Sequence, residues 1–307
     1  MVPGISRSGV AAVLAVGLLI GSCGTPPAEP TKPSATAGFP VTIGSVTLEK
    51  RPERIVVLAP TATEMLFAIG AGAQVTAVDD QSNHPADAPK SALSGFQPNA
   101  EAIAAHQPDL VVISSDINQI AGQLGTLKIP VYQAGPARTL DDSYTQLEDL
   151  GRLTGHTSEA ADVVTRMRSD IAQIVEKVPQ RQVKPTYYFE LDQALYTVTS
   201  TTFIGALFDR IGLVNVADRA ELRDANAGYP QLSAEFVIDA DPDLIFLADT
   251  KCCGQTADTV KARPGWSGIT AVRTGRIVAL NDDIASRWGP RVVELVRTIA
   301  AAASEAG

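Results

Sequence analysis

Hydrophobic runs alternate with amphipathic stretches along most of this chain. Continuous apolar runs, the pattern of buried strands, occupy residues 54–59, 75–78, 109–114 and 131–134. Apolar positions spaced by three and four predict helices between these runs, over residues 64–71, after Asn99 and over 119–128. This alternation predicts a largely parallel sheet covered by helices.

Two features flank this first alternation. Residues 41–48 predict a short hairpin before it, and Thr61 with Glu64 has the spacing of a capping box at the start of the first helix. After it comes a helix that begins at Thr157 or Ser158 and ends before Pro179, with one continuous apolar stripe along its length. A long helix placed between two alternations predicts a connector between two lobes.

The second alternation begins after Pro185. Its apolar runs predict strands over residues 186–191, 194–199, 244–248 and 276–280. Its helices are expected over residues 202–211, from Ser233, and in a closing helix that has Pro290 in its first turn and runs through Ala303.

The two alternations contain a repeated unit. NAEAIAAHQPDLVVIS, which begins at Asn99, aligns without gaps with SAEFVIDADPDLIFLA, which begins at Ser233. Each copy has an N-cap residue, a glutamate in the first turn (Glu101 and Glu235), a Pro-Asp turn and a buried strand. The repeat indicates two similar α/β lobes.

The N-terminal segment differs from the rest of the chain. An apolar run from Gly9 to Gly21 is too short for a comfortable membrane span and fits a secretory signal peptide over residues 1–22. The small residues before Cys23 resemble the lipobox of bacterial lipoproteins, whose cysteine is acylated. An ordinary signal peptide with an incidental cysteine is the alternative. Residues 23–40 would then be the lipid anchor and a flexible spacer rich in proline.

Composition narrows the functions that fit. The formal net charge is −9 and Lys and Arg form no cluster, which argues against a nucleic-acid partner. Three histidines are too few for a multi-histidine zinc receptor, and we expect neither a metal site nor a cofactor. The sequence has no nucleophile elbow, Gly-rich phosphate loop or histidine dyad, so an enzyme is disfavoured.

The chain resembles the bacterial solute-binding proteins for cobalamin, ferric siderophores and haem, whose two lobes are joined by a single helix. The resemblance extends from Arg54 to Ala303 and rests on RIVVLAPTATEMLFAIGAG, NAEAIAAHQPDLVVI, YPQLSAEFVIDADPDLIF and SRWGPRVVELV, in this order. It implies an α/β fold of two Rossmann-like lobes with mainly parallel sheets, over residues 41–156 and 180–307, joined by a helix over 157–179. It also implies a ligand held in the interlobe cleft and a dimeric ABC permease with its ATPase as partner.

Two glutamates are the expected contacts with that permease. In the family that the chain resembles, one glutamate of each lobe docks onto arginines of the permease, and Glu101 and Glu235 are the matching positions. The repeat independently places one carboxylate at equivalent points of both lobes, which suits a transporter of two equal halves. Stabilisation of the helix dipole, worth roughly 0.3–1 kcal/mol, is the alternative role.

Ligand contacts are expected on the loops at the strand ends, where open α/β sheets bind ligands. Aromatic side chains there would pack on a flat macrocycle, and charged ones would pair with an anionic chelate. Packing at the lobe edges is the alternative for the aromatic residues. The candidates are Thr61, His84, Phe96, Gln97, Glu190, Tyr229, Lys251, Cys252, Cys253, Arg287 and Trp288.

Two of these predicted ligand contacts, His84 and the adjacent pair Cys252 and Cys253, have more than one interpretation. His84 would coordinate haem iron or cobalt axially, or act as a hydrogen-bonding surface residue before a proline. Cys252 and Cys253 directly follow a buried strand, and thiols outside the cytoplasm tend to oxidise. The pair would form a vicinal disulfide that offers a flat ligand contact, remain as two thiols, or bind a soft metal.

These inferences combine into one functional prediction. We expect an exported, monomeric lipoprotein, anchored through Cys23 to the outer face of the cytoplasmic membrane, that captures an iron chelate, haem or a corrinoid and delivers it to the permease. The alternatives are a lipoprotein sensor or scaffold without transport, and a hydrolase that would use Glu190 and Asp192 as a carboxylate pair. The choice among ferric siderophore, haem and cobalamin stays open.

Overall fold

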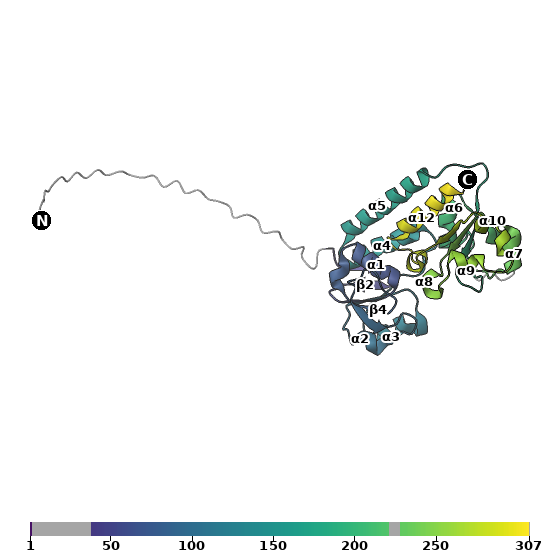
Figure 1. Ribbon diagram of the computed structural model, residues 1–307. Helices are drawn as coiled ribbons and strands as arrows, with labels where there is room; N and C mark the ends of the chain where they lie inside the picture. Colours follow the sequence, from purple (N-terminus) through teal and green to yellow (C-terminus); the bar gives the residue numbers. More distant parts are fainter. Residues whose placement is uncertain (2–37, 221–227, 307) are drawn as a thin grey trace. The chain divides into compact units, whose positions relative to one another are not determined.

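Two parallel sheets organise the residues that the computed structural model describes, which are Met1, 38–220 and 228–306 (Figure 1). The predicted signal peptide, Cys23 and most of the predicted spacer lie outside these residues. The predicted hairpin is present, as strands β1 (Val41–Ile43) and β2 (Val46–Leu48), which pair antiparallel.

The first sheet has strand order β5-β4-β3-β6-β7, and every pair of neighbours is parallel. Its strands are β3 (Ile55–Leu58), β4 (Val75–Asp79), β5 (Lys90–Leu93), β6 (Leu110–Ile113) and β7 (Val131–Gln133). The apolar runs predict all of these strands except β5. In β5 only Leu93 is buried, so the strand has no apolar run to find.

Helices cover both faces of this sheet. They are α1 (Pro60–Ala68), α2 (Ala100–Ala104), α3 (Ile120–Thr126) and α4 (Leu140–Thr154). The predicted capping box of α1 is wrong, because Ala59 is the N-cap residue and no side chain caps the helix. The sequence prediction also lacks α4, whose own capping box is formed by Thr139 and Asp142.

The predicted long helix is α5 (Thr157–Glu176), which connects the two sheets along the chain. It packs against α4 and against the closing helix α12 (Val292–Glu305), which lies beside it in Figure 1. The buried side chains of α5 are those of the predicted stripe, Ala160, Val163, Val164, Met167 and Ile171.

The second sheet has strand order β11-β10-β8-β9 and is also parallel throughout. Its strands are β8 (Thr186–Glu190), β9 (Val214–Asn215), β10 (Leu244–Leu247) and β11 (Ile277–Ala279). The strand predicted over 194–199 is wrong: this stretch has only an isolated bridge between Tyr196 and Gln231.

The helices of the second lobe vary in length. They are α6 (Phe203–Ile211), α7 (Ala234–Ala240), α8 (Thr250–Cys253), α9 (Ala257–Lys261), α10 (Thr270–Arg273) and α11 (Asp282–Ala285). The sequence predicts α6 and α7 but none of the last four, because four or five residues are too few to show a helical period.

One hydrophobic core continues from the first lobe into the second. Alternate residues of each strand face opposite sides of the sheet, so Val57 of β3 and Phe189 of β8 both point into this shared core. Buried side chains of α4, α5, α6 and α12 fill the space between the two sheets. The outer faces have separate cores, under α2 and α3 in the first lobe and under α7 and α9 in the second. A shared core restrains the motion of one lobe against the other.

The sequence repeat is also a structural repeat. Asp109 accepts a hydrogen bond from the backbone N–H of Arg54, which precedes β3, at 3.0 Å, and Asp243 accepts one from the N–H of Thr186 in β8 at 2.8 Å. The helix–strand turn has a positive φ at equivalent positions, 50° at Gln107 and 42° at Asp241. The two lobes therefore share local geometry as well as topology.

Candidate ligand-binding site

A cavity of about 320 Å³ lies where strands of the first sheet end. Segments that follow β3, β4, β5 and β6 form one wall, and residues 283–288 form the other. The cavity thus opens at the carboxyl edge of a parallel sheet, the usual place for a ligand in such folds. Its lining residues are Ala59, Pro60, Thr61, Gln81, Phe96, Ser114, Asp283, Ser286, Arg287 and Trp288.

Four of the predicted ligand contacts meet at this cavity: Thr61, Phe96, Arg287 and Trp288. Gln81, Ser114, Asp283 and Ser286 also line it and were not among the predicted contacts. Gln81 and Ser114 follow strands of the first sheet closely, so the rule that strand ends bind ligands points to them, although small polar residues in loops carry no sequence signal of their own.

Phe96 is the most exposed aromatic side chain at the cavity, with 71% of its surface accessible. The turn before it is anchored by Ser94, whose hydroxyl accepts hydrogen bonds from the N–H groups of Phe96 and Gln97 at 3.3 Å each. A Cβ atom on Gly95 would lie 2.9 Å from Asp79 Oδ2 and 3.1 Å from the Leu58 carbonyl oxygen. Glycine at this position therefore lets the turn lie close against β3 and β4 and presents Phe96 to the cavity.

Trp288 is held from the opposite side by α4. Its indole N–H donates a hydrogen bond to Gln146 Oε1 at 2.8 Å, and its carbonyl oxygen accepts one from the Ser143 hydroxyl. Both partners lie on one helix of the first lobe. The ring is thereby fixed before any ligand arrives, which lowers the entropy cost of binding.

Arg287, predicted as a partner for an anionic ligand, is neutralised by the protein itself. Its guanidinium donates to Glu64 Oε1 at 2.8 Å, to Asp283 Oδ1 at 3.0 Å and to the Gln81 carbonyl oxygen at 3.0 Å. Glu64 is only 3% exposed and also accepts from Arg291 Nε at 2.9 Å, a hydrogen bond that raises the pKa of Arg291. A buried carboxylate is stable only with such partners.

Glu64 is the residue that sequence reasoning assigned to the wrong role. Instead of capping α1 it binds two arginines from the far end of the chain. A signal was present: Glu64 stands alone in the apolar stretch TATEMLFAIG, and a charged residue among buried ones needs a partner. The identity of that partner is visible only in three dimensions.

Helix α8 carries Lys251, Cys252 and Cys253 and lies next to the cavity wall formed by residues 283–288. Asp282 accepts hydrogen bonds from the backbone N–H groups of Lys251 at 2.9 Å and Cys252 at 2.8 Å. Burial alone would raise the pKa of Asp282, but these bonds bring it below its usual value. Lys251 Nζ lies 2.6 Å from Asp283 Oδ2, so Lys251 is also paired within the protein.

The structure joins Cys252 and Cys253 in a vicinal disulfide, and both residues are exposed. The disulfide, one of the three alternatives for this pair, is thus the form that the structure contains. Across residues 38–220 and 228–306, no three His, Cys, Asp or Glu side chains gather in a way that would hold a metal ion.

Glu190 does not face a ligand. It is fully buried and forms a two-point ion pair with Arg263, with distances of 2.6 Å to Nη1 and 2.5 Å to Nη2. Asp192 instead accepts from the N–H of Ala194 at 2.8 Å. The predicted contact through Glu190, and a catalytic pair of Glu190 with Asp192, are therefore corrected: the first carboxylate is already bound by an arginine.

Asp249 is a second buried acid in this region. It is 0% exposed, and neither of its carboxylate oxygens has a hydrogen-bond partner among the described residues. Burial, followed by the nearby charge of Glu190, raises the pKa of Asp249 to about 7.

The remaining predicted contacts lie apart from the cavity. His84 lines a separate cavity of about 360 Å³ together with Phe67, Pro85 and Arg291. Gln97 and Tyr229, the latter 39% exposed, do not line the 320 Å³ cavity. The aromatic pair at that cavity is Phe96 and Trp288.

Glu101 and Glu235 occupy equivalent places in the two lobes. Each is exposed in the first turn of its helix, α2 or α7. The helix starts are capped alike, because the Asn99 side chain accepts from the Ala102 N–H at 2.8 Å and the Ser233 side chain accepts from the Phe236 N–H at 3.1 Å. Both carboxylates thus lie in the first turn of similarly capped helices.

The sequence and the fold match those of a known family. The sequence model of the family described as periplasmic binding protein matches residues 55–284. This chain belongs to that family. The chain is 32% identical over 288 residues to a "Cobalamin-binding protein" of Halobacterium salinarum, covering 88% of this chain and 75% of the relative. It is 30% identical to the "Uncharacterized ABC transporter substrate-binding lipoprotein YvrC" of Bacillus subtilis, with 96% of each chain covered.

Solved structures confirm the predicted two-lobed α/β fold of this periplasmic binding protein. An ABC-type Fe3+-hydroxamate transport protein of Saccharomonospora viridis is 25% identical, with a TM-score of 0.66 over 86% of this chain and 99% of that one. The haem-binding protein RhuT of Roseiflexus sp. RS-1 is 23% identical, with a TM-score of 0.73 and coverage of 83% and 98%. At that identity the likeness of RhuT shows the fold alone.

Membership defines the general function as well. The family consists of substrate-binding proteins that work outside the cytoplasm. Within the described residues of this periplasmic binding protein, every helix is too short or too polar to cross a bilayer.

Proposed function

We propose that this periplasmic binding protein captures a corrinoid in the cavity between its lobes and delivers it to an ABC importer. Support comes from its relatives: the Halobacterium salinarum protein is named for cobalamin, and a "Vitamin B12-binding protein" of Vibrio parahaemolyticus is 29% identical over 84% of this chain and 92% of the relative. Haem and ferric siderophores are the competing ligands, since structural neighbours are named for them.

The charge balance of the cavity carries the choice of a corrinoid. Arg287 is the sole cationic residue among the described residues that line it, and its guanidinium is already bound by Glu64 and Asp283, which Arg291 and Lys251 share. A ferric catecholate is strongly anionic and needs unpaired cations. A corrinoid presents a broad, weakly charged ring edge, which suits the apolar faces of Phe96 and Trp288.

Calorimetric titration with cyanocobalamin, haemin and a panel of ferric siderophores tests this assignment. We expect cyanocobalamin to bind most tightly, and Phe96→Ala and Trp288→Phe each to weaken it by about tenfold, the usual cost of an aromatic anchor. Leu127→Ala is the matched control, because Leu127 is an exposed apolar residue away from the cavity. Tighter binding of haemin or of any ferric siderophore than of cyanocobalamin would overturn the assignment.

In this proposal the protein binds and releases the ligand without changing it chemically. Glu190 is bound to Arg263, so the carboxylate pair that a hydrolase would need is not assembled. Mass spectrometry of the ligand before and after incubation with the protein checks the point, and a converted product would contradict it.

Glu101 and Glu235 dock the loaded, monomeric receptor onto a permease of two equal halves in this proposal. Their matching positions on two similar lobes support the role. The Glu101→Arg/Glu235→Arg double variant should lose uptake of labelled ligand in cells while its affinity in solution stays unchanged. Asp162→Arg/Glu176→Arg, which reverses two exposed acids of α5, is the control and should retain uptake. Uptake by the first variant at the control level would rule the docking role out.

Cys23 anchors the exported protein to the outer face of the cytoplasmic membrane in this proposal. The apolar run before it and the proline-rich stretch after it support the anchor, as does the lipoprotein name of YvrC. Labelled palmitate should be incorporated into the wild type and not into a Cys23→Ala variant, which should appear in the soluble fraction. Equal labelling of both would exclude this anchor.

A further inference from the structure

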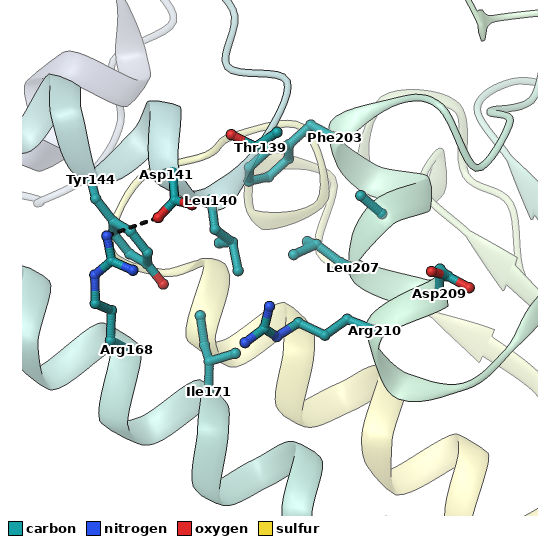
Figure 2. A pocket seen from close by; sticks show the side chains of 11 residues that line it. Thr139, Leu140, Asp141, Tyr144, Arg168, Ile171, Phe203, Leu207, Asp209 and Arg210 are labelled. Carbon is teal, nitrogen blue, oxygen red and sulfur yellow. Dashed lines mark ion pairs between the residues drawn. The ribbon is translucent and has the colours of Figure 1, made fainter.

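A second hollow, of about 450 Å³, lies at the junction of the lobes and shares no lining residue with the cavity at Phe96. Its walls come from three helices: the start of α4, the middle of α5 and most of α6 (Figure 2). A molecule bound in it would touch the first lobe, the connecting helix and the second lobe at once. We call this hollow the junction groove.

One wall of the junction groove carries a solvent-exposed ion pair. Arg168 of α5 pairs with Asp141 of α4 at 2.8 Å, and its guanidinium carbon lies 4.1 Å from the centroid of the Tyr144 ring. This pair satisfies both charges and stacks the arginine on the ring. The Tyr144 ring is buried, and its hydroxyl end lies toward the groove, as Figure 2 shows.

Two donors face the groove without a protein acceptor. Among the described residues, Arg210 of α6 has no carboxylate within salt-bridge distance and Tyr144 donates no hydrogen bond. Figure 2 shows Arg210 reaching toward Ile171 across the groove, and Asp209 also lines the groove. Burial raises the pKa of Tyr144, so its phenol stays a neutral donor. A guanidinium and a phenol in one hollow form a receptor for an anion.

Apolar side chains line much of the junction groove, beside the polar residues Thr139, Asp141, Arg168 and Asp209. Ile171 of α5 is 1% exposed, and Phe203 and Leu207 of α6 are also buried. These side chains form a floor beside the two donors, as in small-molecule sites that combine an apolar surface with a few polar groups. The volume of the groove is also in the range of such sites.

We propose that the junction groove is a second binding site, which takes a small organic anion with an apolar body. Arg210 and the Tyr144 hydroxyl hold the acidic group, and the body lies along Ile171, Phe203 and Leu207. The site is independent of the ligand in the cavity at Phe96, because it shares no residue with it.

Two fluorescent probes that differ in one charge test the proposal. Anilinonaphthalene sulfonate carries the anion and an aromatic body, and N-phenylnaphthylamine has the same body without the charge. The wild type should bind the sulfonate saturably with one site. Arg210→Gln should weaken the sulfonate by about tenfold or more, the usual cost of losing a charged hydrogen bond, and leave the uncharged probe unchanged.

Two further variants locate the binding. Ala206→Trp places a large side chain on the exposed lining position of α6 and should abolish binding of both probes. Arg297→Gln removes an exposed arginine of α12 that does not line the groove, and should change neither affinity. Equal affinity of the sulfonate for wild type and Arg210→Gln would overturn the proposal, as would loss of its binding in Phe96→Ala instead.

Discussion

Arg287 and Glu64 are bound at 2.8 Å although 223 residues separate them in the chain. Glu64 belongs to the first helix of the first lobe, and Arg287 follows the last strand of the second sheet. The pair therefore ties the two lobes together beside the cavity. Both side chains are largely shielded from water, so each depends on the other to neutralise its charge.

Removal of the Glu64 charge should destabilise the whole protein. A Glu64→Gln variant leaves Arg287 and Arg291 without their shared anion, and we expect the free energy of unfolding to fall by about 3–5 kcal/mol, as for other broken buried pairs. Urea denaturation followed by circular dichroism measures it. Arg152→Ala, which breaks the more exposed pair of Arg152 with Asp149, should cost less than about 1 kcal/mol. Equal losses in both variants would contradict the interlobe role.

A methyl group on Gly95 should impair the cavity. In Gly95→Ala the new Cβ would crowd Asp79 Oδ2 and the Leu58 carbonyl oxygen, so the turn must shift and carry Phe96 with it. We expect ligand affinity to fall by at least several-fold, measured by calorimetry. Gly122→Ala in α3 is the matched change, since its Cβ meets nothing within 4 Å, and it should leave affinity unchanged. Unaltered affinity in Gly95→Ala would show that the turn has room.

Stability should fall as the pH rises toward neutrality because of Asp249. Its pKa is about 7 in the folded protein and 3.8 in an ordinary environment, so the folded state holds the proton more tightly. The stability that protonated Asp249 contributes is fully present below pH 3.8, the ordinary pKa. It declines as the pH rises from there and is lost above the folded-state pKa of about 7. Urea midpoints from pH 5 to 9 should show this decline for the wild type. Asp249→Asn, which stays neutral, should flatten the profile and gain relative stability at high pH, whereas Asp162→Asn, an exposed change, should not.

The vicinal disulfide should be chemically detectable and should affect binding. Intact-mass spectrometry with and without a dithiol should differ by the mass of two hydrogen atoms, because Cys252 and Cys253 are joined and exposed. Since α8 borders the wall of the cavity through Lys251 and Asp283, we expect reduction to weaken ligand binding several-fold. The Cys252→Ser/Cys253→Ser variant should bind like the reduced protein and ignore the dithiol. A mass that reduction leaves unchanged would refute the disulfide.

Local patterns predicted most of the secondary structure. Strands such as β3 and β10 are continuous apolar runs because both of their faces are buried, and α5 shows its stripe because one face is. Short elements such as α8 and β9 were not predicted, because a few residues are too few to show a hydrophobic period. The predicted strand over 194–199 failed because this apolar stretch packs without a neighbouring strand to complete its ladder.

The candidate site was predicted only as a set of loops. The rule of strand ends selects Thr61, Phe96, Arg287 and Trp288, which line the cavity. The same rule also selects Glu190 and His84, which do not line this cavity. Glu190 is buried against Arg263, and His84 lines another cavity. Two loop side chains line the same cavity only if segments far apart in the chain come close in space. Hydrophobic periodicity is a local property and does not predict those distances.

The sequence by itself determined the two alternations, the connecting helix and the paired glutamates at Glu101 and Glu235, because hydrophobic period and helix capping are local properties. Only the tertiary structure decided the charge of the cavity. The sequence alone predicts Arg287 as a free cation. Its ion pair with Glu64 forms only because the chain folds back from the second lobe onto the first. Electrostatic neutralisation acts through space, so it is settled by the final packing and not by the order of residues.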